Sequence, residues 1–251
     1  TARCNAAAAL VSATQVLIAG GDNCANTTAL MTWDLWDSTA ASTPVSNTGA
    51  NKLTVGRRLF TATVVGTGKV LLAGGAATAT ADLFTLGAPS TVAPTTSGML
   101  VTRFGHTATL LTSSTATTAC PTATATSSCV LIAGGNSNLG KTWEIYDAST
   151  NTFPRNATTA GADLVLLARQ FHAAAAFANG KVLLAGGSDG ATAQSTTEVF
   201  DPAATTLSFT AGLGLQLPRF RTAAAYAPAQ DVLVLIGGNA VGPSTEQVIT
   251  P

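Results

Sequence analysis

Short apolar runs, each ended by a pair of glycines, recur along the whole chain. The glycine pairs lie at 20–21, 74–75, 134–135, 186–187 and 237–238, so that successive pairs are 54, 60, 52 and 51 residues apart. Valine, leucine and isoleucine runs of about five residues that stop at Gly-Gly are typical of strands followed by a turn with positive φ. The pattern therefore predicts five copies of one β-sheet unit.

Three further features repeat in phase with the glycine pairs. An Ala/Thr-rich apolar run precedes each pair, at 6–10, 61–65, 107–111, 173–177 and 222–226. An arginine precedes each run, at Arg3, Arg57, Arg103, Arg169 and Arg219. An acidic residue follows each pair (Asp34, Asp82, Glu144, Glu198, Glu246), and an aromatic stands two positions later in the first four copies (Trp36, Phe84, Tyr146, Phe200). Each copy thus predicts strands a, b and c, usually followed by a strand d.

One such unit cannot bury its faces alone, so the copies must stack, and closing them into a ring protects the sheet edges. We predict an all-β chain, a five-bladed β-propeller that forms one domain over residues 1–251. The blades are expected at about 1–55, 56–101, 102–167, 168–217 and 218–251. The fifth copy stops just after strand c, so we expect the last blade to lack its outer strand or to obtain it from elsewhere.

The fourth copy carries the fullest motif. Arg-x-x-His-x-Ala, Val-Leu-Leu-Ala-Gly-Gly and Glu-Val-Phe-Asp-Pro follow one another between Arg169 and Pro202. This order closely resembles the kelch repeat, whose period is also near 50 residues. The usual strand-d tryptophan is missing, with Phe153 and Phe209 as its stand-ins. The resemblance implies a propeller whose d–a and b–c loops share one face, where family members commonly bind partners.

Transferred by motif position, that face carries the five repeat arginines and the polar loops after the glycine pairs. The loop residues are Asp22, Asn23, Asn136, Asn138, Ser188, Asp189 and Asn239. A ring of arginines could bind carboxylate or sulfate groups bidentately. The alternative is structural: each arginine occupies a framework position and pairs with a repeat acid or a loop carbonyl.

An enzymatic interpretation rests on two histidines and two tyrosines. Copper-radical oxidases such as galactose oxidase use a kelch-like propeller with two of each, one tyrosine being linked to a cysteine. His106 and His172 share one repeat position, however, while Tyr146 and Tyr226 stand at ordinary strand positions. The common catalytic motifs are absent from the sequence. We expect no metal, no cofactor and no enzyme activity.

The four cysteines indicate disulfides, because the sequence has no CxxC and too few histidines for a zinc site. Of the three possible pairings, Cys4–Cys24 with Cys120–Cys129 joins cysteines that share a face of the blade model. Disulfides imply an oxidising compartment. The second pair brackets an insertion at 112–128, which is a binding finger, a contact for another chain or a plain surface loop. Asn26 and Asn156 lie in N-glycosylation sequons, which matter only in a eukaryotic source.

Charge excludes some partners. Only 10% of residues are charged, with 12 Lys and Arg against 12 Asp and Glu, so no net field attracts nucleic acid or an anionic membrane. No apolar stretch is long enough to span a bilayer, and the start at Thr1 suits a mature protein whose leader has been removed, as it would suit a fragment. We predict a secreted or cell-surface binding module for protein or glycan. A structural subunit of an extracellular assembly is the alternative, and a copper oxidase the second.

Overall fold

The computed structural model describes residues 2–25, 28–40, 45–47, 51–111, 117–121, 128–135, 141–156, 167–240 and 247–249. These residues form antiparallel strands and turns without a helix, which confirms the all-β prediction. In this part of the chain, accordingly, there is no helix of the length and apolarity that crossing a membrane requires. The chain divides into two compact units, 1–104 with 150–152, and 105–149 with 153–251. Each unit is described by itself.

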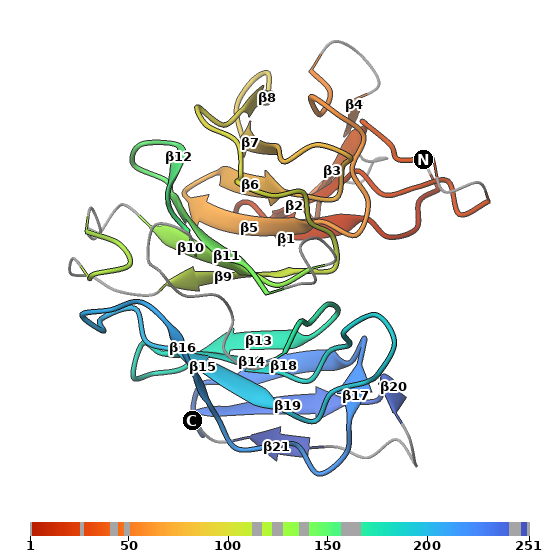
Figure 1. Ribbon diagram of the computed structural model, residues 1–251. Coiled ribbons are helices and arrows are strands. Elements are labelled where there is room, and N and C mark those ends of the chain that lie inside the picture. The colour runs from red at the N-terminus through yellow and green to blue at the C-terminus, as the bar shows by residue number, and fades with distance from the viewer. Residues whose placement is uncertain are drawn as a thin grey trace. The chain divides into compact units, whose positions relative to one another are not determined.

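The first unit contains two four-stranded sheets, in which each strand pairs with its neighbours in sequence (Figure 1). The first sheet consists of β1 (Ala7–Leu10), β2 (Gln15–Ala19), β3 (Trp33–Asp37) and β4 (Val45–Asn47). The second consists of β5 (Thr61–Gly66), β6 (Lys69–Ala73), β7 (Ala81–Thr85) and β8 (Thr91–Pro94). Each sheet therefore corresponds to strands a to d of one sequence copy.

The second unit holds the sheets of the remaining three copies, apart from Thr152, which clusters with the first unit. The third sheet consists of β9 (Thr107–Leu111), β10 (Cys129–Ala133), β11 (Trp143–Asp147) and β12 (Thr152–Asn156). The fourth consists of β13 (Ala173–Ala176), β14 (Val182–Ala185), β15 (Thr197–Phe200) and β16 (Phe209–Ala211). The described residues of the fifth copy form a three-stranded sheet of β18 (Ala223–Ala227), β19 (Val232–Ile236) and β21 (Gln247–Ile249). They also form a separate two-stranded sheet of β17 (Arg219–Phe220) and β20 (Asn239–Ala240).

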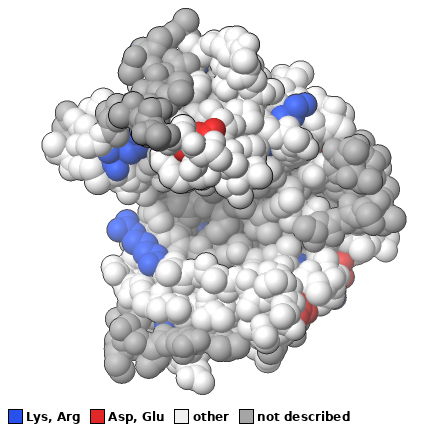
Figure 2. Space-filling model, turned by 180° about the vertical axis from the view of Figure 1, so that it is seen from behind, with Lys and Arg blue, Asp and Glu red and all other residues white. Residues whose placement is uncertain are grey.

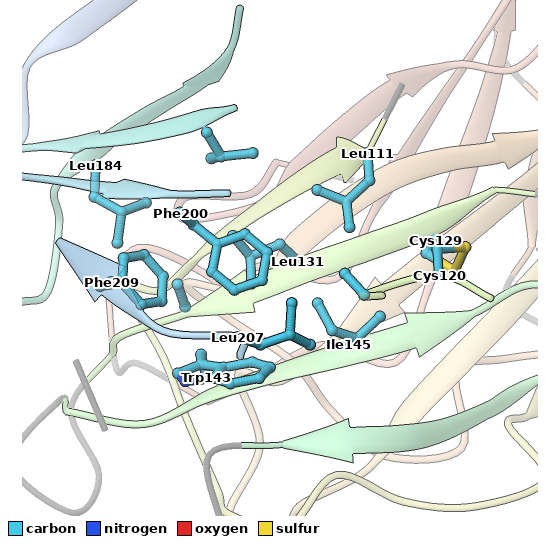
Figure 3. Packing of buried hydrophobic residues seen from close by; sticks show 13 residues of the cluster. Leu111, Cys120, Cys129, Leu131, Trp143, Ile145, Leu184, Phe200, Leu207 and Phe209 are labelled. Carbon is cyan, nitrogen blue, oxygen red and sulfur yellow. A yellow bond between two sulfur atoms is a disulfide. The ribbon is translucent and has the colours of Figure 1, made fainter. Parts of the chain in front are cut away.

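Hydrophobic cores lie between the sheets of neighbouring copies. In the first unit the Trp33 ring meets the Phe84 ring edge-on at 5.2 Å. In the second unit Trp143 packs against Phe200 at 5.5 Å, within a cluster that joins the third and fourth sheets (Figure 3). In the second and fourth copies, the aromatic two positions after the repeat acid thus packs against the residue just before the acid of the preceding copy. Trp36, the first copy's aromatic, is 44% exposed, because no sheet precedes its own within the first unit.

Candidate functional site

The repeat arginine forms a clamp beneath the glycine pair, seen most completely in the fourth copy. Arg169 is fully buried. Its Nη1 donates to the carbonyl oxygens of Gly186 at 2.6 Å and Thr196 at 3.1 Å, and its Nη2 donates to Thr196 Oγ1 at 3.0 Å. Its Nε and Nη2 donate to Glu198 Oε1 at 3.1 and 2.6 Å. The guanidinium therefore ties the end of β14 to the start of β15, and the acid neutralises its charge.

Arg57 makes the same clamp in the second copy. Its Nη1 donates to the carbonyl oxygens of Gly74 and Thr80, both at 2.8 Å, and its Nε donates to Asp82 Oδ2 at 3.0 Å. Arginine and aspartate are both fully buried. Burial lowers the pKa of Arg57, and the Asp82 carboxylate opposes this shift. A buried ion pair with its lone pairs and donors satisfied is stable only while both partners stay in place.

The first copy makes the same clamp, and the arginines of the third and fifth copies are buried as well. Arg3 contacts the carbonyl oxygens of Gly20 at 2.6 Å and Thr32 at 3.0 Å and the Asp34 carboxylate at 2.7 Å. Arg219 is 1% exposed and donates to the Gly237 carbonyl at 3.3 Å, and Arg103 is likewise 1% exposed. Burial favours the framework role for these arginines over ligand binding, because a ligand on the surface cannot approach the guanidinium groups.

Sequence reasoning missed one member of the clamp. The residue two positions before each acid is Thr32, Thr80, Thr142, Thr196 or Ser244. In the second and fourth copies its carbonyl and its hydroxyl both accept from the arginine. The signal was available as a [Ser/Thr]-x-[Asp/Glu] pattern in phase with the glycine pairs.

The glycine pair links each copy to the next one. The N–H of Gly135 donates to the carbonyl oxygen of Arg169 at 2.9 Å, and Gly187 donates to Arg219 at 2.8 Å. The preceding residue, Gly134, has a φ of 69°, and a Cβ atom there would lie 2.5 Å from the Arg169 carbonyl oxygen. Only glycine accepts both the positive φ and this close approach. The same bond joins Gly21 to Arg57 and Gly75 to Arg103, at 2.7 Å each.

A left-handed backbone residue stands two positions after each arginine. These residues are Asn5, Leu59, Gly105, Phe171 and Arg221, with φ between 53° and 64°. The backbone N–H of three of these residues donates to the carbonyl oxygen of the residue at the same position in the preceding copy: Leu59 to Asn5 at 3.0 Å, Phe171 to Gly105 at 2.6 Å and Arg221 to Phe171 at 2.9 Å. A non-glycine residue in this region costs about 1–2 kcal/mol. The backbone hydrogen bonds offset this cost and hold Leu59, Phe171 and Arg221 in the left-handed conformation.

The predicted loop residues divide by burial, and two of them are not surface groups. Asp22 is 1% exposed and accepts from Asn5 Nδ2 at 2.7 Å and from the Cys24 N–H at 3.0 Å. These bonds, Asn5 first, lower the pKa of Asp22. Ser188 is 6% exposed, and its hydroxyl accepts from the Gly190 N–H at 3.0 Å. Both positions lie inside short β-bridges that extend the sheets beyond the glycine pair, which is why their side chains turn inward.

The remaining loop residues are exposed or lie outside the described part of the chain. Asn23, Asp189 and Asn239 are exposed. The Asp189 carboxylate accepts from the N–H groups of Ala191 at 2.9 Å and Thr192 at 2.7 Å, and bonds from these two N–H groups, Thr192 first, lower its pKa. This is an ordinary hydrogen-bonded turn. Asn26, Asn136 and Asn138 lie outside the described residues, and Asn156 ends β12.

A cleft of about 450 Å³ opens in the first unit at the end of the sheets where the d–a and b–c loops lie, which we call the loop end. It is lined by Ala29, Arg58, Leu59, Ala76, Ala77 and Phe104, with two glycines. These residues precede β3, β5 and β9 or follow β6. The cleft thus belongs to the d–a and b–c loops that the kelch resemblance singled out. Charged side chains are sparse on the face of the molecule that Figure 2 shows.

The two histidines share one repeat position, and both side chains are buried. His172 is 7% exposed, and its Nε2 lies 2.8 Å from Thr107 Oγ1. Its Nδ1 has no hydrogen-bond partner among the described residues. Burial, then the charges of Arg169 and His106, hold the pKa of His172 well below its ordinary value. The His172 ring lies against Gly134 of the third copy, just as the Phe60 ring lies against Gly20 of the first copy. Packing against the preceding glycine pair therefore explains a ring at this repeat position in His172 and Phe60.

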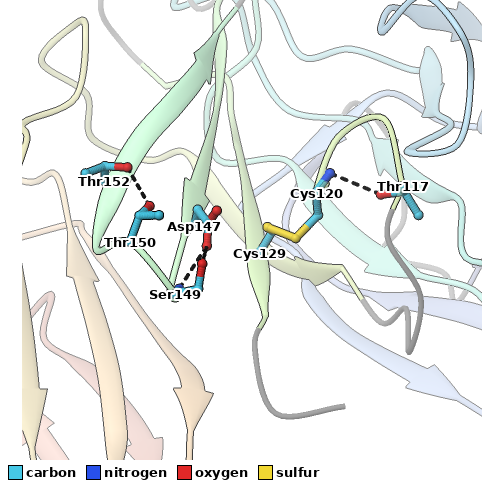
Figure 4. Close-up of a disulfide and its surroundings, with 7 residues drawn as sticks. All are labelled: Thr117, Cys120, Cys129, Asp147, Ser149, Thr150 and Thr152. Carbon is cyan, nitrogen blue, oxygen red and sulfur yellow. Dashed lines mark hydrogen bonds between the residues drawn. A yellow bond between two sulfur atoms is a disulfide. The ribbon is translucent and has the colours of Figure 1, made fainter. Parts of the chain in front are cut away.

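Both expected disulfides, Cys4–Cys24 and Cys120–Cys129, are formed, and the described residues include no free cysteine. The sulfur atoms of Cys4 and Cys24 and a carboxylate oxygen of Asp22 lie within 4.8 Å of one another, a spacing that could hold a metal ion. The two sulfurs are joined in a disulfide, however, and only thiolate sulfur binds a metal in this way. The second bridge closes the base of the insertion (Figure 4). Ala119, 1% exposed, donates its N–H to the Pro202 carbonyl at 3.0 Å. Ala119 and Cys120 of the insertion therefore belong to the core, and residues 112–116 and 122–127 lie outside the described part of the chain.

The tyrosines are also used structurally. Tyr146 is fully buried, and its ring packs against Phe153 at 5.2 Å. Burial, and then the Asp147 carboxylate, raise the pKa of Tyr146 to about 12. The Tyr226 hydroxyl donates to Asp231 at 2.6 Å. Since all four cysteines are in disulfides, no cysteine is available for linkage to either ring.

Comparison with known proteins agrees with the fourth copy. Residues 171–206 match the family model of the Kelch motif. The matched segment contains β13, β14 and β15 together with the glycine pair and the acid of that copy. A search among curated proteins finds no match to this chain. The kelch resemblance predicted from the sequence is therefore confirmed.

Proposed function

We propose that the chain is a non-catalytic protein-interaction module, and that a partner protein binds at the loop end of its sheets. The Kelch motif at 171–206 is the observation that carries this proposal, since this motif suggests a protein-interaction role. The cleft at the loop end of the first unit offers a concave surface there. Its volume is in the range of protein ligand sites, which are about 300–1,000 Å³.

We also propose that the five copies form the blades of one five-bladed propeller whose last blade lacks an outer strand. The in-phase repeats and the four-stranded sheets of the described residues support this architecture. A compact body of 251 residues has a radius of gyration near 18 Å. Small-angle X-ray scattering of the monomer is expected to give this value. A radius well above 20 Å would mean that the sheets do not form one compact domain.

The proposal includes secretion and the absence of catalysis. The two disulfides support an oxidising compartment. The buried Tyr146 and the bridged cysteines argue against the copper-radical alternative, and metal analysis of the purified protein tests it. Copper bound in a one-to-one ratio would overturn the non-catalytic assignment.

Peptide selection tests the interaction role. A phage-displayed peptide library is selected on the immobilised chain, and enriched peptides are synthesised and titrated by calorimetry. Ala77→Arg at the loop end is expected to weaken binding at least tenfold. Thr67→Arg, in the exposed β5–β6 turn at the other end of the same sheet, is the matched control and should leave binding unchanged. Failure to enrich any peptide, or equal loss in both variants, would contradict the proposal.

An assembly subunit remains the second candidate because the first sheet carries an exposed apolar face. Leu10 is 59% exposed and Trp36 is 44% exposed. Both are cross-strand neighbours of Val16, so they lie on the same face. Light scattering tests this role: concentration-dependent self-association that Trp36→Lys abolishes would favour it, and a strictly monomeric chain would count against it.

A further inference from the structure

We propose that the cleft of the first unit is a binding site for a carboxylate flanked by an apolar group, such as an acidic residue beside a leucine in a partner protein. Arg58 is the group that binds the carboxylate. The inference deepens the proposed function, and it rests on that function for the kind of partner.

Arg58 differs from the repeat arginine beside it. The Arg57 side chain is fully buried in its clamp, whereas the Arg58 side chain is 38% exposed and lines the cleft. Its Nη1 lies 3.8 Å from the Asp22 carboxylate, too far for a hydrogen bond. Asp22 already accepts from Asn5 and from the Cys24 N–H. The guanidinium of Arg58 makes no hydrogen bond to any described residue, and its side chain lines the cleft.

The backbone around Arg58 is fixed before any ligand arrives. Its N–H donates to the Gly75 carbonyl oxygen at 3.0 Å. The next residue, Leu59, has a φ of 54° and donates its N–H to the Asn5 carbonyl oxygen at 3.0 Å. A backbone held by such bonds loses little conformational freedom on association, so only the Arg58 side chain has to be ordered by a ligand. The cleft is therefore preorganised rather than an accident of a loose loop.

The side chains that line the cleft determine which chemical group can bind next to the carboxylate. Leu59 and Phe104 supply apolar surface, and Ala29, Ala76 and Ala77 leave room because their side chains are small. The free volume of about 450 Å³ accommodates one or two amino-acid side chains. An apolar group packs against these walls while the acid meets the guanidinium.

The charge of the cleft favours a carboxylate over a phosphate. One guanidinium matches one carboxylate through two parallel N–H···O bonds. The buried Asp22 carboxylate 3.8 Å from Arg58 already offsets part of its charge. A dianionic group needs more positive charge than this cleft provides. Aliphatic or aromatic monocarboxylates are therefore the class of ligand that fits.

A matched pair of small molecules tests the site directly. We titrate 3-phenylpropionate and its neutral analogue 3-phenylpropanamide into the whole chain and follow binding by NMR. The wild type is expected to prefer the carboxylate roughly tenfold, which is the effect of one charge-assisted bond. In Arg58→Gln the preference should disappear, in Arg58→Lys it should be reduced, and in Ala77→Trp both ligands should be excluded from the cleft. Ala77 is exposed, so the tryptophan does not disturb a core.

Arg221→Gln is the control for nonspecific binding to arginine. Arg221 is exposed, lies in the second unit with its guanidinium 4.4 Å from the Phe171 ring centre, and is not part of the cleft. Its replacement should leave the preference unchanged. Equal affinity for the two ligands in the wild type, a preference that survives Arg58→Gln, or one that Arg221→Gln also removes would each overturn the site.

These results separate the site from the proposed function. Peptides that enrich and bind at the loop end without an acidic residue, and ignore Arg58→Gln, would leave the interaction role standing and refute the carboxylate site. A carboxylate preference that depends on Arg58, combined with a failed peptide selection, would establish the site and refute a peptide-binding module.

Discussion

Arg57 and Arg58 are neighbours in sequence with opposite roles, and comparing their alanine variants tests the account of the framework. Arg57→Ala leaves the fully buried Asp82 carboxylate without its cation and removes the donor to the carbonyl oxygens of Gly74 and Thr80. Asp82 keeps only its bonds from Thr54. Arg58→Ala removes a half-exposed side chain that makes one long contact with Asp22.

The structure fixes the expected magnitudes. Removing one partner of a buried ion pair costs about 3–5 kcal/mol, a large share of the 5–15 kcal/mol that stabilises a typical domain. A loss of about 4 kcal/mol lowers the urea midpoint by roughly 1.3–2 M if the slope is 2–3 kcal/mol per M. Arg58→Ala should stay within about 0.5 kcal/mol of the wild type, as surface substitutions usually do.

Urea unfolding followed by circular dichroism measures both variants. The double variant Arg57→Met with Asp82→Leu should be less destabilised than Arg57→Ala alone, because no unpaired charge is then buried. Equal midpoints for Arg57→Ala and Arg58→Ala would refute the clamp as a stabilising element. So would a double variant that is as unstable as the sum of its parts.

Three further predictions follow from the described contacts. The pKa of His172 is lower in the folded chain than in the unfolded chain, so protonation of this imidazole favours unfolding. The free energy of unfolding therefore falls as the pH drops below about 6.5, by up to ~1.4 kcal/mol per pH unit. His172→Phe should flatten this slope in pH-dependent unfolding, and an unchanged slope would contradict the prediction. Gly134→Ala should cost more than Gly180→Ala in thermal melts, because a Cβ at Gly180 meets no atom within 4 Å while both have positive φ; equal losses would contradict it. Mild reduction should open the exposed Cys4–Cys24 bridge before the buried Cys120–Cys129 bridge, as alkylation and mass spectrometry would show, and the reverse order would count against the described burial.

Much of the fold follows from periodicity in the sequence. The glycine pairs, the Ala/Thr runs and the acid-to-aromatic spacing predict strands a, b and c at nearly the observed residues, since alternation and turn chemistry are local. The prediction for 61–65, for example, corresponds to Thr61–Gly66. The local disulfide pairings follow from the same repeat, because it places the two cysteines of each pair at the same end of one blade.

The candidate site could be predicted only in part. Kelch resemblance indicates the loop end, but repeat position alone favours Arg57 and Asp22, both of which are buried. Arg58 directly precedes the left-handed turn at Leu59, and leucine has no intrinsic preference for that conformation. Likewise, Phe171 adopts positive φ because backbone bonds to Gly105 and Arg221 impose it. Tertiary contacts, rather than local residue preferences, determine these positions.

The proposal that a partner protein binds at the loop end is tested most directly by hydrogen–deuterium exchange with a selected peptide bound. Protection is expected in segments 56–60 and 75–80, which line the cleft, while the β5–β6 turn at 66–69 should exchange as in the free chain. Protection confined to 66–69, or no protection at 56–60 and 75–80 under saturating peptide, would contradict it.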